Sequence, residues 1–239
     1  MMGRSAPRVA DVTSTPKAVL EYTVLCSIAI FLASTSIRAE EFTRTSHYSV
    51  RMFSFGTFTI ESRVGDITVE GWDYPRLEID AEKLVRAGSQ KKANALFQKI
   101  NVALAGKDKK ITLMTLYPPR RLWRPFRAES KLTVNYTIRM PYDSNIKLSC
   151  VDGDVTIHGL TGSEVVKVSY GDVEIDVPDP YRVRYFKAHT FLGYVQSDLH
   201  GMEEDSAGFS RGIFFTAGGD QDIDVDVRMG GVFVYAETP

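Results

Sequence analysis

A glycine–aspartate step followed by alternating apolar residues is the feature that most restricts how this chain can fold. It reads VGDITVE from Val64, DGDVTIH from Asp152 and YGDVEID from Tyr170. Glycine supplies a positive φ at a corner without steric cost, and the short aspartate side chain accepts backbone N–H groups in turns. Residues two and four positions after the glycine share one face of a strand. The step therefore predicts a tight corner that leads into a half-buried strand.

Later glycines continue the pattern at intervals that suit a repeating architecture. The glycines at 153, 171, 193, 212 and 231 are spaced 18, 22, 19 and 19 residues apart. Such a period fits one coil of a β-solenoid, in which each coil hydrogen-bonds to the next. A β-sandwich, whose turns recur every 8–12 residues or so, is the less favoured alternative. The predicted corner residues are Gly65, Asp66, Gly153, Asp154, Gly171, Asp172, Gly193, Gly212 and Gly231.

The chain divides into three predicted parts. Residues 1–39 form a targeting segment, residues 40–142 a β-rich N-terminal part, and residues 143–239 the solenoid repeats. The β-rich part contains one predicted helix, 89–100, in which Ala93, Phe97 and Ile100 share one face and Ser89 caps the start. The predicted fold class is thus all-β with one short helix.

The first 39 residues resemble a secretory signal. Three basic residues precede the apolar run VLCSIAIFLA, and small residues follow it. The uncharged window from Tyr22 to Ile37 has 16 residues, whereas a membrane-spanning helix needs about 20. We therefore expect cleavage after Ala39 and an exported protein, periplasmic, cell-surface or secreted. An uncleaved N-terminal anchor is the alternative.

Composition and motifs argue against several classes of function. A net charge of −1 gives no field that would recruit nucleic acid. The histidines form no zinc motif, and the row Asp220, Asp222, Asp224 and Asp226 diverges along a strand instead of converging on Ca²⁺. Cys150 falls on an inward position of its strand and is predicted to be core rather than a nucleophile. We expect no metal, no cofactor and no catalytic set.

The segment PPRRLWRPFR, residues 118–127, is the predicted contact site. It contains Arg120, Arg121, Trp123, Arg124 and Arg127. Arginine side chains suit phosphate and carboxylate groups, and Trp suits a lipid headgroup boundary or the face of a sugar. The alternative is a solvated connection whose aromatic side chains pack on the domain.

Two longer stretches carry a family resemblance. VGDITVEGWDYPRLEIDAEK from Val64 and YTIRMPYDSNIKLSCVDGDVTIHGLTG from Tyr136 resemble the bacterial putative-adhesin domain family, a family of unknown function. The resemblance covers residues 50–235 and implies a right-handed β-solenoid exported beyond the inner membrane. The later coils GYVQS and GIFFT depart from the pattern because they lack the aspartate.

These observations favour a non-enzymatic surface or envelope module for adhesion, binding or scaffolding. One alternative is an envelope-stress sensor that binds anionic lipid or polymer. Another is a polysaccharide-active β-helix enzyme that uses the turn carboxylates as acid and base. The expected partners are a cell-envelope polymer, anionic lipid or another surface protein.

Overall fold

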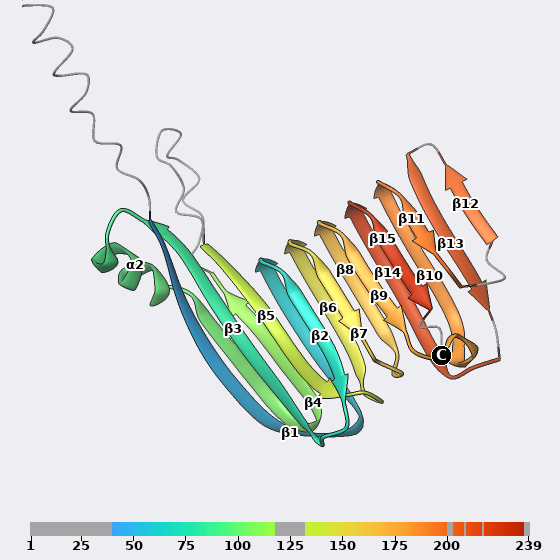
Figure 1. The fold of residues 1–239 in the computed structure, drawn as a ribbon, viewed down its shortest axis with the longest axis horizontal. Coiled ribbons are helices and arrows are strands. Elements are labelled where there is room, and N and C mark those ends of the chain that lie inside the picture. The colour runs from blue at the N-terminus through green and yellow to red at the C-terminus, as the bar shows by residue number, and fades with distance from the viewer. Residues whose placement is uncertain (1–39, 118–131, 200–202, 208, 217, 237–239) are drawn as a thin grey trace, which may run out of the picture. The chain divides into compact units, whose positions relative to one another are not determined.

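The computed structural model describes residues 40–117, 132–199, 203–207, 209–216 and 218–236. The predicted signal segment 1–39 and the predicted contact residues Arg120, Arg121, Trp123, Arg124 and Arg127 lie outside these residues. No helix in the described part of the chain is long and apolar enough to cross a membrane. The described part is nearly all β-structure with one α-helix (Figure 1), so the predicted fold class is confirmed at this level.

The strands are β1 (Glu40–Val64), β2 (Ile67–Trp72), β3 (Arg76–Ala87), β4 (Asn101–Leu116), β5 (Leu132–Pro141), β6 (Asn145–Asp152), β7 (Val155–His158), β8 (Glu164–Tyr170), β9 (Val173–Val177), β10 (Val183–Leu192), β11 (Val195–Ser197), β12 (Glu203–Ala207), β13 (Ser210–Thr216), β14 (Gln221–Met229) and β15 (Val232–Ala236). The α-helix is α2 (Gln90–Phe97), and a 3-10 turn, η1, spans Pro180–Arg182. The predicted parts 40–142 and 143–239 contribute strands to the same two sheets.

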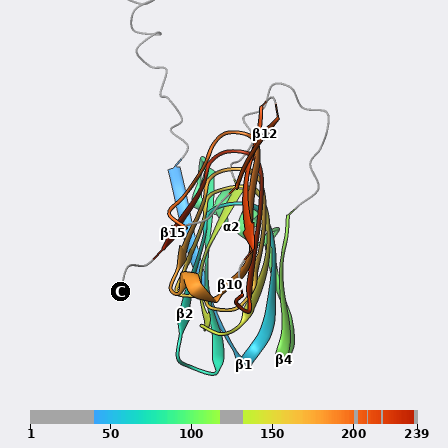
Figure 2. The same ribbon diagram turned by 90° about the vertical axis from the view of Figure 1, so that its right-hand side faces the viewer.

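The strands form two layers that face each other (Figure 2). Sheet A has the order β11–β15–β9–β7–β2–β5–β3–β1, and sheet B has the order β4–β1–β6–β8–β14–β10–β13–β12. Strand β1 belongs to both sheets, because it pairs with β3 up to Arg51 and with β4 and β6 from Met52 onward. A positive φ of 57° at Phe55 accompanies this crossing. One long strand thus joins the two layers.

Strand pairs that cross from sheet B to sheet A make up the coils of the stack. These pairs are β1–β2, β6–β7, β8–β9, β14–β15 and β10–β11, and neighbouring coils pair in parallel. Alternate residues of each strand point inward, so Ile67, Val155 and Val173 are buried in register. Burial of each such side chain stabilises the fold by about 1.5–3 kcal/mol. The core is therefore a column of aliphatic side chains between the sheets.

The coils do not stack in chain order. The last coil in the sequence, β14–β15, lies between β8–β9 and β10–β11. Strand β13 pairs antiparallel with β10 and with β12. The chain therefore forms the β12–β13 hairpin at the edge of sheet B first, and β14–β15 then lies between the two earlier coils. The predicted stacking of each coil on the next one in sequence holds only as far as β9.

The glycine corners sit on one another with almost no space between them. An added Cβ on Gly153 would lie 2.2 Å from the carbonyl oxygen of Gly65, and one on Gly171 would lie 2.2 Å from that of Gly153. In the same way, an added Cβ on Gly230 would lie 2.0 Å from the carbonyl oxygen of Gly171, and one on Gly193 would lie 2.0 Å from that of Gly230. The glycine is therefore required twice, by a φ of 135° at Gly171 and by the close approach of the backbones.

The aspartates of the repeat bind the neighbouring coil rather than their own turn. The amide of Asp154 donates to Asp66 Oδ1 at 3.0 Å, and the amide of Asp172 donates to Asp154 Oδ1 at 2.8 Å. Gly231 N–H donates to Asp172 Oδ1 at 2.7 Å. We call this series the aspartate ladder. It satisfies one backbone donor per corner that would otherwise lack a partner in the sheet.

The prediction of a corner is wrong for two of the glycines. Gly212 lies inside β13, which runs antiparallel to its neighbours, and it has no positive φ among the residues described. In the last coil the corner residue is Gly230, with a φ of 146°, one residue before Gly231. Regular spacing misled the prediction at Gly212, because the stretch from the corner Gly193 to the corner Gly230 includes the hairpin β12–β13 and is about two coils long.

The predicted helix is confirmed, although it is shorter than the range 89–100. The Ser89 side chain accepts a hydrogen bond from the amide of Lys92, and α2 ends at Phe97. Ala93 and Phe97 are buried against the core at the end of the stack formed by β1 and β3. The helix therefore covers apolar side chains that no further coil covers.

Replacement of Gly171 by alanine should destabilise the protein by at least about 2 kcal/mol, because a Cβ at that positive φ would also clash with the Gly153 carbonyl. Gly218→Ala is the matched control, since nothing lies within 4 Å of a Cβ there. Urea denaturation of both variants measures the difference. Equal loss of stability in the two variants would contradict the assignment of the corner.

Candidate functional site

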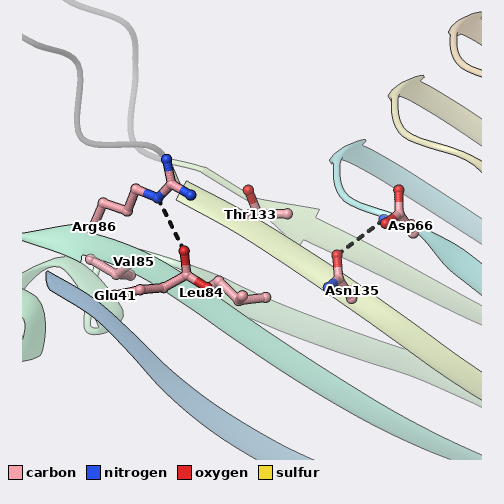
Figure 3. Close-up of a pocket in the computed structure, with 7 residues that line it drawn as sticks. All are labelled: Glu41, Asp66, Leu84, Val85, Arg86, Thr133 and Asn135. Carbon is pink, nitrogen blue, oxygen red and sulfur yellow. Dashed lines mark hydrogen bonds and ion pairs between the residues drawn. The ribbon is translucent and has the colours of Figure 1, made fainter.

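A shallow depression lies on the outer side of sheet A (Figure 3). Its volume is about 200 Å³, and it is lined by Glu41, Asp66, Leu84, Val85, Arg86, Thr133 and Asn135. Arg86 Nε donates to Glu41 Oε2 at 3.0 Å across one side, and the amide of Asp66 donates to Asn135 Oδ1 at 3.1 Å on the other. The lining is mostly polar and offers carboxylate, amide, hydroxyl and guanidinium groups, which suit a ligand rich in hydroxyl groups.

The depression is a weakly held site rather than a built pocket. The side chains of Arg86 and Glu41 are 58% and 45% exposed, and exposed ion pairs contribute only about 0–1 kcal/mol. Its polar groups can therefore turn to a ligand at little cost. Thr133 is the second residue of β5, so the chain that leaves residues 118–131 enters the described structure beside this depression.

The other flank of residues 118–131 is fixed at the glycine corner. Tyr117 Oη donates to the carbonyl oxygen of Val64 at 2.8 Å, and the guanidinium of Arg63 lies 5.6 Å from the centre of the Tyr117 ring. Burial raises the pKa of Tyr117 to about 12. In the sequence, the five predicted contact residues lie between Tyr117 and Thr133, and their role stays a prediction.

The predicted row of aspartates, on and just before β14, is paired with basic residues on and just before β10. Asp220 binds Arg182, with Nη2 and Oδ2 2.8 Å apart, and Asp222 binds Arg184. Asp224 lies opposite Lys187 in the parallel register. Because Arg182 donates to it, the pKa of Asp220 is lowered. The row is a surface ladder of ion pairs between two coils that are distant in sequence, a pairing that spacing alone did not reveal.

A serine, a histidine and an aspartate from three strands form a hydrogen-bonded chain. His189 Nε2 lies 2.6 Å from Ser210 Oγ, and His189 Nδ1 lies 3.3 Å from Asp226 Oδ1. The order of groups matches that of a hydrolase triad. However, the Asp226 side chain is 60% exposed on the outer face of sheet B, where water competes for it. We assign these hydrogen bonds a structural role, because they tie β13 to β10 and β14. They could not be predicted from the sequence, because the order of the strands in the sheet differs from their order in the chain.

The turn aspartates that an enzyme could use as acid and base are already engaged in backbone contacts. Asp66, Asp154 and Asp172 each accept an amide from the neighbouring coil. Cys150 is 2% exposed, and burial raises the pKa of its thiol to about 11, which confirms its predicted place in the core and suppresses the thiolate. Among the described residues, no group of three or more His, Cys, Asp or Glu side chains is placed to hold a metal ion.

A buried carboxyl group was missed by the sequence analysis. Glu164, at the start of β8, is fully buried, and its Oε1 accepts from Gln221 Nε2 at 3.3 Å. Glu164 Oε2 and Gln221 Oε1 have no partner. Burial raises the pKa of Glu164 to about 8. A proton on Glu164 Oε2 would make this oxygen a hydrogen-bond donor, whereas Gln221 Oε1 can only accept a hydrogen bond.

Comparisons with known proteins support the fold. No protein-family model matches the chain, and no curated protein matches it. A solved structure of a putative cell adhesion protein from Clostridium sporogenes is 12% identical, covers 81% of this chain and 100% of its own, and superposes with a TM-score of 0.50. A putative adhesin from Bacteroides fragilis is 12% identical over 82% of this chain and 97% of its own, with a TM-score of 0.33. The first likeness shows a shared fold.

Glu164→Gln should remove a pH dependence from the stability of the protein. Because the pKa is raised from 4.5 to about 8 on folding, the folded chain holds a proton that the unfolded chain releases. The free energy of unfolding of the wild type therefore falls as the pH rises from about 4.5 to about 8. The variant should gain at least about 1.4 kcal/mol over the wild type between these pH values, the equivalent of one pKa unit.

Chemical denaturation at pH 4.5 and pH 8 measures this gain, with the exposed Glu174→Gln as the control. If the wild type and Glu164→Gln lose stability in parallel as the pH rises, Glu164 is ionised in the folded state and the raised pKa is wrong.

Proposed function

We propose that the protein is an exported, non-enzymatic binding module with an adhesin-like role, built on a right-handed β-solenoid. The observation that carries the proposal is the aspartate ladder. The carboxylates that a polysaccharide-active enzyme would need accept backbone amides instead, so the repeat serves as a scaffold. The outer surfaces of the coils are then left for binding.

The fold comparison favours the same class of function. The solved structure that superposes with a TM-score of 0.50 is called a putative cell adhesion protein. Export agrees with the sequence of residues 1–39, which we propose to be a cleaved signal segment. A single buried thiol, Cys150, is all that would remain in the mature chain, and this suits an oxidising compartment.

We place the contact with anionic polymer at residues 118–127. Tyr117, which precedes this segment, binds at the glycine corner, and Thr133, which follows it in the sequence, lines the polar depression. Its four arginines supply charge-assisted hydrogen bonds, and Trp123 supplies a contact that salt does not weaken. A sensor of envelope damage would use the same segment, and the binding experiment below bears on both roles.

Replacement of Arg120, Arg121, Arg124 and Arg127 by serine should lower binding to lipopolysaccharide or teichoic acid at least about tenfold at low salt, because exposed charges supply the attraction. Trp123→Ala should lower only the binding that persists at high salt. Pull-down with immobilised polymer, at two salt concentrations, measures both effects.

The matched control replaces Lys91, Lys99, Lys107 and Lys109 by serine. These lysines are exposed on α2, the loop that follows it and β4, and their loss changes the net charge equally. Equal loss of binding in both variants would show a non-specific charge effect. Failure of the wild type to bind either polymer at low salt would overturn the proposed contact.

A further inference from the structure

Exposed apolar side chains follow the sheet B side of the glycine corner across three coils. Tyr170, Met229 and Leu192 occupy one register row immediately before the corner glycines. They are 44%, 40% and 44% exposed. Adjacent rungs of a sheet are about 4.8 Å apart, so these side chains form one continuous strip along the ends of β8, β14 and β10.

The neighbouring row on the outer face of sheet B contains two apolar and two basic residues with Ser169 at its centre. Val151 and Phe191 are 44% and 57% exposed. Arg63 lies beside Val151, and Arg228 lies between Ser169 and Phe191, by the register of the residues on either side of them. We call the two rows together the rim. Its apolar members are Val151, Tyr170, Phe191, Leu192 and Met229.

The rim differs from the scattered exposed apolar residues that are normal on a protein surface. Tyr170, Met229 and Leu192 are direct neighbours in one register row, and contiguous exposed apolar patches mark interaction sites. The rim is also an outer edge, where the chain turns from one sheet to the other, and not a groove that would hold a peptide. An apolar edge interleaved with arginines matches the boundary between lipid headgroups and acyl chains.

The basic segment absent from the described structure joins the chain at this edge. Tyr117, its first flank, binds the carbonyl oxygen of Val64, which lies in the same register row as Asp152, Tyr170, Met229 and Leu192. The sequence of that segment contains four arginines, Trp123 and Phe126. In sequence, the basic residues therefore follow from the end of this register row at Val64, and Asp152 lies between Val64 and the apolar strip, which begins at Tyr170.

We propose that the rim docks on an anionic lipid surface, with the apolar side chains at the headgroup boundary. This deepens the proposed function by naming the partner of an envelope-binding module and rests on that function. The acidic residues Asp66, Asp154 and Asp172 lie just beyond the glycines, on the sheet A side. Together with the exposed Asp152, which is the partner of Tyr170 in the sheet B register row, they restrict docking to the sheet B side of the corners at Gly171, Gly230 and Gly193 and so fix the tilt of the stack on the membrane.

The first test replaces Tyr170, Leu192 and Met229 by serine in the full chain. Co-sedimentation with vesicles of phosphatidylcholine and phosphatidylglycerol in equal parts should fall at least about tenfold, or about 1.4 kcal/mol. The matched control replaces Tyr74, Tyr142 and Tyr181, which are exposed on loops outside the rim, and should bind as the wild type does. Because all six side chains are exposed, melting temperatures should change little in either variant.

The second test reports on the rim locally. Tryptophan fluorescence of Leu192→Trp should be quenched by brominated lipid in the same vesicles, whereas that of Tyr181→Trp should change no more than the wild type. Unchanged sedimentation of the rim variant, or equal quenching in the two tryptophan variants, would show that the rim does not dock on lipid. If the wild type still binds polymer in that case, the proposed function stands. If the wild type binds lipid but not polymer, the result counts against the proposed function and not against docking of the rim.

Discussion

Close contact between stacked glycine corners is the constraint on which the rest of this structure depends. Each corner glycine lies against the carbonyl group of the corner before it, at a distance that no side chain would allow. The aspartate ladder then ties the corners from Gly65 to Gly230 to one another, with one backbone amide at each step. Together these two contacts set the register of both sheets, because the strands on either side of a corner have no freedom to slide. The inward column of valine and isoleucine side chains follows from that register.

The same constraint explains why the surface carries features that the sequence separates widely. Once the register is set, residues at equal distances from the corner form rows across the coils. Such rows produce the ion pair between β10 and β14, the hydrogen bonds through His189 and the apolar rim. The binding module that we propose would need no pocket, because extended partners such as polymers or lipid surfaces can contact a whole row. The Clostridium sporogenes structure shares the fold.

Much of this architecture could be predicted from the sequence because its cause is local. The Gly-Asp step, the alternation after it and the cap at Ser89 are each readable within a few residues, and the structure bears them out at Gly153, Gly171 and α2. The order of the coils could not be predicted, since the insertion of β14–β15 before β10–β11 depends on which partner each strand finds in space. For the same reason the sequence hid the buried Glu164–Gln221 contact and misplaced the corners at Gly212 and Gly231.

Amide hydrogen exchange at the corners tests the central claim most directly. The amides of Asp154 and Asp172 lie in exposed turns, and that of Gly231 lies at a buried position between β14 and β15; each donates to an aspartate of the neighbouring coil. We predict slow exchange at all three, and selective acceleration at Gly231 when Asp172 is replaced by alanine. Fast exchange at these amides in the wild type, or no change at Gly231 in the variant, would contradict the account of how the coils are held together.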